Sequence, residues 1–158
     1  MTAARTGNPA GSPTAPRIRP AEPSDYPAVA GLLEAAGLPT EGLPPSLADF
    51  VVAAADDGLV GAVGLEVYGP AALLRSAVVA DRARGRGLGA ALVDRLLERA
   101  RARGVRQVYL LTTTAEDWFP RFGFTRIERH AVPPALHASA EFRGACPESA
   151  TVMAAILV

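Results

Sequence analysis

A run of glycines and arginines stands between two regular segments, and its composition suits phosphate binding. Its glycines are Gly85, Gly87 and Gly89, and the arginines among them are Arg84 and Arg86. The apolar segment before it, 73–79, is typical of a strand, and the amphipathic segment after it, 88–103, of a helix. Glycines allow positive φ and free N–H groups, and a helix N-terminus adds the positive end of its dipole. The run therefore predicts an anion site, with a tight turn whose arginines face water as the alternative.

Two common phosphate loops do not match this turn. A lysine P-loop needs Gly-Lys-Ser/Thr, and all 16 basic residues of the chain are arginine. A dinucleotide-binding turn needs an acidic residue at the end of the next strand, about twenty residues further on. The segment Val105–Val108 offers none.

The rest of the pattern predicts an α/β fold with a mixed central sheet of about seven strands flanked by helices. Strands are expected at 17–19, 50–55, 60–68, 73–79, 105–112, 125–129 and 151–158. Helices are expected from about 26 to Gly37, at 45–49, at 88–103, around 116–121 and from 134 toward 142. The first strands form antiparallel hairpins, and βα units follow them.

Composition limits the function classes. A chain of 158 residues with a formal net charge of zero indicates one globular domain, expected at 17–158, with no strong attraction to nucleic acid or membranes. Residues 1–16 lack a signal-peptide core and are expected to form a disordered tail. One cysteine, Cys146, fits a reducing cytoplasm, and no metal site is expected from two histidines and one distant cysteine. A monomer and a homodimer stay open.

The glycine-arginine run resembles the acyl-CoA loop of the GNAT acetyltransferases, which reads Arg/Gln-x-x-Gly-x-Gly/Ala. Arg84, Gly87 and Gly89 fill that pattern, and the predicted order of elements from Arg17 onward resembles the family's order. In the family the loop amides hold the pyrophosphate of acetyl-CoA and the preceding strand pairs with the pantetheine arm. The resemblance implies that acetyl-CoA is bound by Ala77, Val78, Val79, Arg84, Gly85, Arg86, Gly87, Leu88, Gly89, Ala90 and Thr112.

The resemblance also implies which groups take part in the reaction. The sheet of this fold usually opens beside the loop, which makes the Val79 N–H the candidate that polarises the thioester carbonyl. Phe122-Gly123-Phe124 looks like the family's closing Gly-Phe signature. Four residues before that glycine the family usually has a tyrosine that protonates the leaving thiolate. This chain has Phe119 there, which has no proton to donate.

Three positions are candidates for the acceptor side. Glu66 is the only carboxylate in the central hairpin strands and is the predicted base for the acceptor ammonium, with a solvated carboxylate as the alternative. Arg75 and Ser76 precede the loop and are candidates for binding an anionic group of the acceptor. An ion pair between Arg75 and Glu66 or another acid is the alternative. Thr113 ends a strand and can contact the acceptor or cap the next turn.

A narrower resemblance, to acetyltransferases encoded in bacterial arsenic-resistance operons, comes from four stretches and a dipeptide. They are 64–66, 72–76, 109–114 and 138–142, with Cys146-Pro147. It implies an acceptor that is a toxic amino-acid analogue of the arsenic or phosphinothricin type. We therefore expect an acetyl-CoA-dependent N-acetyltransferase for a small-molecule amine, acting by direct transfer. A protein or peptide N-acetyltransferase and a non-catalytic acyl-CoA-binding sensor are the alternatives, and an acyl-Cys146 intermediate is less expected.

Overall fold

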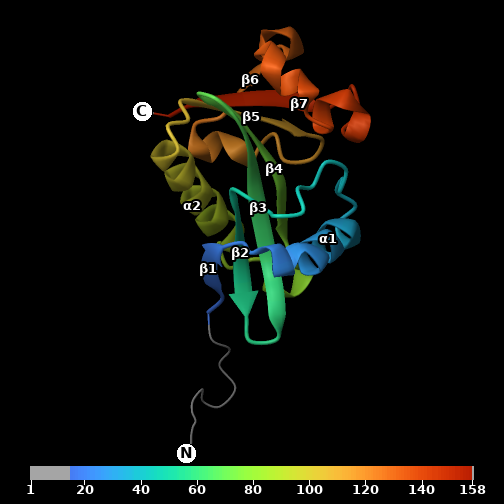
Figure 1. Cartoon of the computed structure of the whole chain (residues 1–158), viewed down its shortest axis with the longest axis vertical. Helices are drawn as coiled ribbons and strands as arrows, with labels where there is room; N and C mark the ends of the chain where they lie inside the picture. Colours follow the sequence, from blue (N-terminus) through green and yellow to red (C-terminus); the bar gives the residue numbers. More distant parts are fainter. Residues whose placement is uncertain (1–14, 158) are drawn as a thin grey trace, which may run out of the picture.

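The computed structural model describes residues 15–157, which form a seven-stranded mixed sheet with helices on both faces (Figure 1). The strand order is β1-β2-β3-β4-β5-β7-β6. The strands are β1 (Arg17–Pro20), β2 (Phe50–Ala55), β3 (Gly58–Tyr68), β4 (Ala71–Val79), β5 (Gln107–Thr112), β6 (Thr125–Ile127) and β7 (Thr151–Ile156). The α/β fold and the strand number predicted from the sequence are confirmed. The tail predicted for residues 1–16 lies, up to residue 14, outside the described residues.

One parallel pair interrupts an otherwise antiparallel sheet. β4 and β5 are parallel and are joined through α2 (Leu88–Ala102), whereas every other neighbouring pair is antiparallel. A parallel pair needs a crossover connection, and the amphipathic helix supplies it. The glycine-arginine run is the link between β4 and this helix, so the fold places the run at the end of a central strand.

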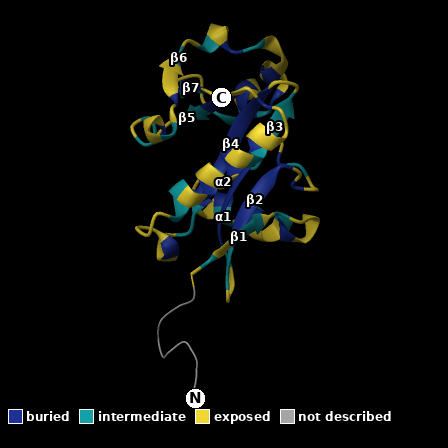
Figure 2. Ribbon diagram, turned by 90° about the vertical axis from the view of Figure 1, so that its left-hand side faces the viewer, coloured by how far each residue is buried: buried dark blue, intermediate teal, exposed yellow. Residues whose placement is uncertain are grey.

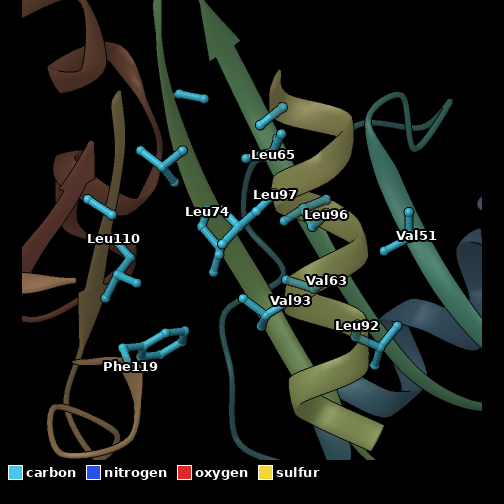
Figure 3. Close-up of a cluster of buried hydrophobic side chains, with 14 of the residues drawn as sticks. Val51, Val63, Leu65, Leu74, Leu92, Val93, Leu96, Leu97, Leu110 and Phe119 are labelled. Atoms are coloured by element: carbon cyan, nitrogen blue, oxygen red, sulfur yellow. The ribbon is translucent and has the colours of Figure 1, made fainter. Parts of the chain in front are cut away.

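Helix α2 covers one face of the sheet. Its apolar stripe consists of Leu92, Val93, Leu96, Leu97 and Ala100, all buried. Figure 3 shows Leu97 of this stripe beside Leu74 of β4, and Leu65 of β3 belongs to the same cluster. The outer face of α2 is exposed in Figure 2, as expected of a helix with a single apolar stripe.

Two separate layers cover the other face. Helix α1 (Tyr26–Ala35) buries Val29 and Leu33 against β2 and β3, at one end of the sheet. The connection between β6 and β7 packs Leu136 and Phe142 against Leu73, at the other end. The two layers therefore leave the middle of β4 between them (Figure 1).

Several predicted short helices differ from the structure. Residues 45–49 form turns, because Leu47 and Asp49 have φ of 52° and 61°, outside the right-handed helical region. Burial of Leu47 and pairing of Asp49 with arginines of α2 select that conformation. The helix predicted around 116–121 is only the turn η3 (Phe119–Phe122), which ends at Gly123 with φ of 93°.

The helix predicted from 134 toward 142 is split in two. It consists of η5 (Pro134–Ala138) and a wide turn, η6 (Glu141–Ala145), separated by the extended residue Ser139. The turn η4 (Arg129–Ala131) precedes them, where the sequence predicted the end of a strand. The turn η1 (Pro23–Asp25) precedes α1, and η2 (Asp81–Ala83) follows β4. Within residues 15–157, no helix has both the length and the apolar character needed to cross a membrane.

Candidate active site

The parallel strands β4 and β5 pair over a short distance and then separate. Their register runs from Ala71 opposite Gln107 to Leu73 opposite Tyr109. β4 continues to Val79 and β5 to Thr112 beyond the last pair. The sheet is therefore open along the second half of β4, which leads directly into the glycine-arginine run.

A cavity of about 730 Å³ follows this opening. Its wall contains six of the residues predicted to bind the cosubstrate, namely Ala77, Val78, Val79, Arg84, Gly89 and Thr112. It also contains the predicted acceptor-side residues Arg75, Ser76 and Thr113. The other predicted cosubstrate residues, Gly85, Arg86, Gly87, Leu88 and Ala90, lie on the adjoining turn and first helical turn but not in this wall.

The turn itself has the backbone expected for an anion site. Gly85 and Gly87 have φ of 81° and 76°, the left-handed region in which glycine is unstrained. The first helical hydrogen bond of α2 runs from the Ala91 N–H to the Gly87 carbonyl, at 3.1 Å. The amides of residues 88–90 precede it, so their N–H groups point out of the helix end. Arg84 lies beside them, where its Nε donates to the Val79 carbonyl at 3.0 Å.

The N–H of Val79 faces the opening. Ala80 donates its N–H to the Val60 carbonyl of β3 at 2.8 Å. Hydrogen-bonded and non-hydrogen-bonded pairs alternate in an antiparallel ladder, and Val79 pairs with Gly61 at the next position. The polar backbone groups of Val79 therefore point away from β3, toward the side from which β5 has withdrawn.

Aromatic side chains line the cavity near the start of α2. Trp118 lies close to Gly89, since a Cβ there would be 3.5 Å from its ring. Phe119 is buried and packs edge to face against Trp118 and Phe124. Both Trp118 and Phe119 belong to the cavity wall. The position usually held by a tyrosine in the family that the sequence resembles is thus an apolar part of this wall.

Arg75 is the centre of a buried polar cluster on the opposite side of the cavity. Its side chain has no exposed area. Its guanidinium donates from Nε to Ser76 Oγ at 3.0 Å, from NH1 to Glu66 Oε2 at 2.7 Å and from NH2 to the Glu41 carbonyl at 2.9 Å. Glu141 Oε2 lies 3.8 Å from Nε. A buried guanidinium needs such partners, and two carboxylates and a carbonyl supply them.

The sheet register explains the pairing of Arg75 with Glu66. Glu66 is opposite Leu73, so Arg75 is its diagonal neighbour on the same face. Tyr68, two residues along the same face, donates its hydroxyl to the other oxygen, Oε1, at 2.5 Å. Burial, together with this bond to Glu66, raises the pKa of Tyr68 to about 12. The ion pair that the sequence left as the alternative for Arg75 is therefore present.

Glu66 pairs with Arg75 but is not part of the wall of the first cavity. It lines a second cavity, of about 630 Å³, with Tyr68, Ser139 and Arg143. The two cavities share Glu41 and Ala145 in their walls, so they are adjacent.

The backbone of β4 is irregular beside this cluster. Arg75 pairs with Gly64 and Val78 with Ala62, so two residues of β4, Ser76 and Ala77, oppose a single residue of β3. This is a β-bulge, and Ser76 has φ of 61°. Strained residues of this kind persist where the surrounding structure holds them and are frequent at functional sites.

The threonines that end β5 line the cavity as well. Thr112 Oγ1 accepts a hydrogen bond from the Ala115 N–H at 2.9 Å, so it caps the following turn. Thr113 is exposed and also belongs to the wall.

Sequence reasoning did not single out Glu141 as a functional residue. It lies on η6 in the wall of the first cavity and is 4% exposed. Burial raises the pKa of its carboxyl to about 7, against the attraction of Arg75 and with a smaller contribution from Glu66. The neighbouring Cys146 has its pKa raised to about 11, again chiefly by burial. The feature of the sequence that could have indicated Glu141 is an acidic residue between Ala140 and Phe142, in a connection rich in alanine and proline.

Comparisons with known proteins agree with this geometry. A family profile described as "Acetyltransferase (GNAT) domain" matches residues 46–126, which are 81 of the 158 residues. Rv2747 of Mycobacterium tuberculosis, solved with CoA and NLQ, is 27% identical, with 90% of this chain and 100% of that chain covered and a TM-score of 0.75. The chain belongs to the GNAT acetyltransferase family and is an acyltransferase.

Two further solved structures share the fold. N-acetylglutamate synthase of Neisseria gonorrhoeae, solved with coenzyme A and N-acetyl-glutamate, is 21% identical with a TM-score of 0.77. The match covers 93% of this chain but 36% of the synthase, so the chain spans about a third of that protein's length. PaiA N-acetyltransferase of Thermoplasma acidophilum, solved with coenzyme A, is 14% identical with a TM-score of 0.66, and the match covers 91% of this chain and 100% of that one.

Proposed function

We propose that this chain is an acetyl-CoA-dependent N-acetyltransferase that acetylates the amine of a small molecule by direct transfer. One observation carries the proposal. The opening between β4 and β5 is a single cavity that runs from the glycine-arginine turn, at Arg84 and Gly89, to the buried polar cluster at Arg75 and Glu141. A cosubstrate held at one end and an acceptor at the other would meet beside β4.

The turn is suited to the pyrophosphate of acetyl-CoA. The N–H groups of residues 88–90, the helix dipole and the neighbouring arginines all favour an anion at the start of α2. Gly85 and Gly87 provide the positive φ that the turn requires. The matched structures solved with CoA support the same ligand for this chain.

The open half of β4 can bind the pantetheine arm and the thioester. Its Val79 N–H points into the opening and is the proposed donor to the thioester carbonyl. A fixed backbone N–H stabilises the oxyanion that forms when the amine attacks, because it needs no reorganisation during the reaction. The bulge at Ser76 holds this part of β4 out of register with β3.

The acceptor end is suited to a small molecule. A volume of about 730 Å³ is in the range of small-molecule sites, and part of it must take the end of acetyl-CoA. Two segments border this end, residues 36–41 and 145–147. The matched N-acetylglutamate synthase, solved once with N-acetyl-glutamate and once with L-arginine, supports an amino-acid acceptor. A protein or peptide acceptor, the alternative, would need room for a chain on both sides of the amine.

An anionic group on the acceptor has one buried cation available. Arg75 uses one N–H each toward Ser76, Glu66 and Glu41, which leaves two of the five N–H groups of its guanidinium. The Arg75 side chain has no exposed area, so a carboxylate or an arsenic or phosphorus oxyanion would reach these N–H groups after the residues that cover them move. The narrower acceptor class, a toxic amino-acid analogue within the same reaction, requires that movement.

The sensor alternative rests on Phe119. A chain without a proton donor for the thiolate can bind acetyl-CoA without turning it over. The cavity nevertheless contains Glu141, a buried carboxylate close to the expected acceptor, beside the buried guanidinium of Arg75, and binding of the cosubstrate alone does not need these buried charges. This favours an enzyme.

The test is release of CoA thiol by the purified chain with acetyl-CoA and a panel of amines. The panel contains phosphinothricin, its arsenic analogue, ordinary amino acids, aminoglycosides, polyamines and short peptides. Each amino acid is paired with its carboxamide, which keeps the amine and removes the anionic group. Turnover with amino acids and a rise in KM of about tenfold for the carboxamides would support both the reaction and the role of Arg75.

Acetyl-CoA binding is measured beside turnover, by isothermal titration calorimetry. Binding without release of thiol from any amine would overturn the proposed enzyme and support the sensor. Turnover restricted to peptides would overturn the small-molecule acceptor.

A further inference from the structure

Two carboxylates lie on either side of one guanidinium in the acceptor half of the site. Glu66 comes from β3 and Glu141 from η6, and Arg75 of β4 lies between them. The three residues are far apart in sequence and are brought together where the loop before β2 and the turn η6 meet over β4.

The two carboxylates differ in how they are bound. Glu66 accepts a hydrogen bond on each oxygen, at 2.7 Å from Arg75 and at 2.5 Å from Tyr68. Glu141 is 3.8 Å from Arg75 Nε, beyond hydrogen-bond range, and that Nε already donates to Ser76. Both oxygens of Glu66 therefore already have hydrogen-bond donors, whereas the carboxylate of Glu141 accepts no hydrogen bond from Arg75.

The two carboxylates also line different cavities. Glu141 is in the wall of the cavity that contains Val79 and the glycine-arginine turn, and Glu66 is in the wall of the second cavity. A general base must reach the proton it removes, directly or through one water. Of the two carboxylates beside Arg75, Glu141 shares a cavity with the proposed donor to the thioester, and Glu66 does not.

The charge of the cluster changes with the protonation of Glu141. With Glu141 ionised, two carboxylates face the single guanidinium of Arg75, and the cluster carries one negative charge to attract an ammonium. With Glu141 protonated, the Arg75–Glu66 pair is neutral by itself. A proton taken from the acceptor therefore leaves this buried cluster electrically balanced, which is the less costly state away from water.

We propose that Glu141, rather than Glu66, accepts the proton of the acceptor ammonium, and that Glu66 is a positioning residue that holds Arg75. This rests on the proposed N-acetyltransferase function and deepens it. The carboxylate of Glu141 takes one proton from the ammonium and frees the nitrogen lone pair. That pair forms the C–N bond at the thioester carbon, and the C–S electron pair leaves on sulfur. A second nitrogen proton neutralises the thiolate, the amide keeps the third, and the proton on Glu141 leaves to water.

The groups around Glu141 determine the pKa of its carboxyl. The charged and titratable groups on the elements around it are Arg75, Glu66 and Tyr68 on the sheet, Glu41 on the loop before β2, Arg143 and Cys146 on and after η6, Arg129 on η4 and His137 on η5. Burial places the pKa of Glu141 at about 7, and the negative charge of Glu66 contributes to the rise. Activity should therefore fall on the acid side as Glu141 becomes protonated.

The experiment compares Glu141→Gln with Glu66→Gln in the full chain. Both substitutions keep size and shape and remove one carboxylate from the same guanidinium, so each is the matched control of the other. The rate is measured from pH 5 to 9 with the best amine of the panel, and again with an amine whose own pKa differs. The acid limb is the fall in rate at low pH. If it reports a group of the enzyme, its midpoint pH does not change when the amine is changed.

We expect Glu141→Gln to lower kcat/KM about 100-fold near pH 7.5 and to abolish the enzyme's acid limb. Glu66→Gln should lower the rate less than Glu141→Gln does, and should keep the acid limb but move it to lower pH, because the carboxylate that raises the pKa of Glu141 is gone. If Glu66 is the base, as expected from the sequence, Glu66→Gln should show the large loss of rate and the loss of the acid limb, and Glu141→Gln should show the smaller effect. Full activity and an unchanged pH profile in Glu141→Gln would overturn the proposal.

Measurements of acetyl-CoA binding distinguish a failure of the proposed role of Glu141 from a failure of the proposed N-acetyltransferase function. Both variants should bind acetyl-CoA with a Kd within about twofold of the unsubstituted chain, since neither residue belongs to the turn that binds it. If Glu141→Gln fails to fold, the direction of the pH shift in Glu66→Gln decides, and an unshifted limb overturns the proposal. If the unsubstituted chain acetylates no amine, the proposed function fails first, and the role of Glu141 fails with it.

Discussion

The two ends of the cavity are built in different ways. The cosubstrate end consists of one continuous stretch, residues 77–90, in which a strand, a turn and a helix N-terminus follow one another. The acceptor end is assembled from four stretches that are distant in sequence, around residues 41, 66, 75 and 141. Local conformation can build the first, but only tertiary packing can build the second. Substitutions should therefore affect the two ends independently.

Close backbone contacts hold the acceptor end together. A Cβ on Gly42 would be 2.8 Å from the Ala140 Cβ and 3.2 Å from Arg75 NH1. A Cβ on Gly64 would be 2.3 Å from the Phe50 ring, so this ring of the neighbouring strand β2 packs directly over Gly64, on the strand that carries Glu66. These contacts bring the loop before β2 and the turn η6 close enough to surround one guanidinium.

Among the substitutions that change ligand binding, the largest effect is expected from Gly87→Val at the cosubstrate end. Gly87 has φ of 76°, and a Cβ added to it would have nothing within 4 Å. Valine is therefore destabilised there by its backbone conformation and not by a steric clash. A change of φ that relieves this strain would displace the N–H groups of the next turn. We expect acetyl-CoA to bind about 50-fold more weakly, from the loss of two or three hydrogen bonds to an anion.

The matched control is Gly104→Val, just beyond the other end of α2, with φ of 80° and the same open surroundings. It should lower stability to a similar extent but leave the Kd for acetyl-CoA within about twofold. Equal Kd values for the two variants by calorimetry would contradict an anion site at the turn.

Gly42→Ala should act on the acceptor end alone. The added methyl group meets Ala140 at a backbone with φ of 75°, so the loop and η6 must separate. We expect the acceptor KM to rise about tenfold while the Kd for acetyl-CoA stays within about twofold. Gly69→Ala, with φ of 67° and open surroundings, is the control for backbone strain. A parallel loss of acetyl-CoA affinity in Gly42→Ala would show that the two ends are coupled.

Glu141 should make stability depend on pH in a defined direction. Its pKa is about 7 in the folded chain against an ordinary value of 4.5, so between these pH values the folded chain holds a proton that the unfolded chain releases. The stabilisation is complete below about pH 4.5 and is lost as the pH rises through 7. The Tm of the unsubstituted chain relative to Glu141→Gln should fall by roughly 5 °C between pH 4.5 and 8. A constant difference would mean that Glu141 is ionised throughout.

The smallest effects distinguish the arginines of the turn. Arg84 donates to the Val79 carbonyl, at the point where the strand leads into the turn, and its replacement by alanine should weaken acetyl-CoA binding about fivefold. Arg82 pairs with Asp57 at 2.9 Å, and both side chains are more than half exposed. Arg82→Ala is the control and should change the Kd by less than about twofold, because exposed pairs contribute little. A larger loss of acetyl-CoA affinity in Arg82→Ala than in Arg84→Ala would indicate that the anion site lies nearer to η2.

The cosubstrate end was predictable because its signal is local. The glycines of the turn, the apolar run before it and the amphipathic stripe after it identify strand, turn and helix within about 30 residues. The order of the seven strands along the chain and the helices before β2 and after β4 followed from the same kind of pattern and are confirmed. The roles of the individual residues stay predictions until binding is measured.

The acceptor end was only partly predictable. The pairing of Arg75 with Glu66 was foreseen as one alternative, because an arginine within an apolar strand needs a partner. The role of Glu141 was not foreseen, because its importance depends on burial beside Arg75, 66 positions away in the sequence. The short helices were the least accurate predictions, since Leu47, Asp49 and Ser139 take their conformations from what they pack against rather than from their neighbours in the chain.

The sequence by itself determined the α/β order, the strand–turn–helix at the centre and the resemblance to acetyl-CoA-dependent enzymes, because each depends on residues close together in the chain. Only the tertiary structure decided that β4 and β5 separate, that Glu66 and Glu141 share one guanidinium and that one of them is tightly bound and the other is not. The physical reason is that burial and charge pairing depend on distances in space, which the spacing of residues along the chain does not specify.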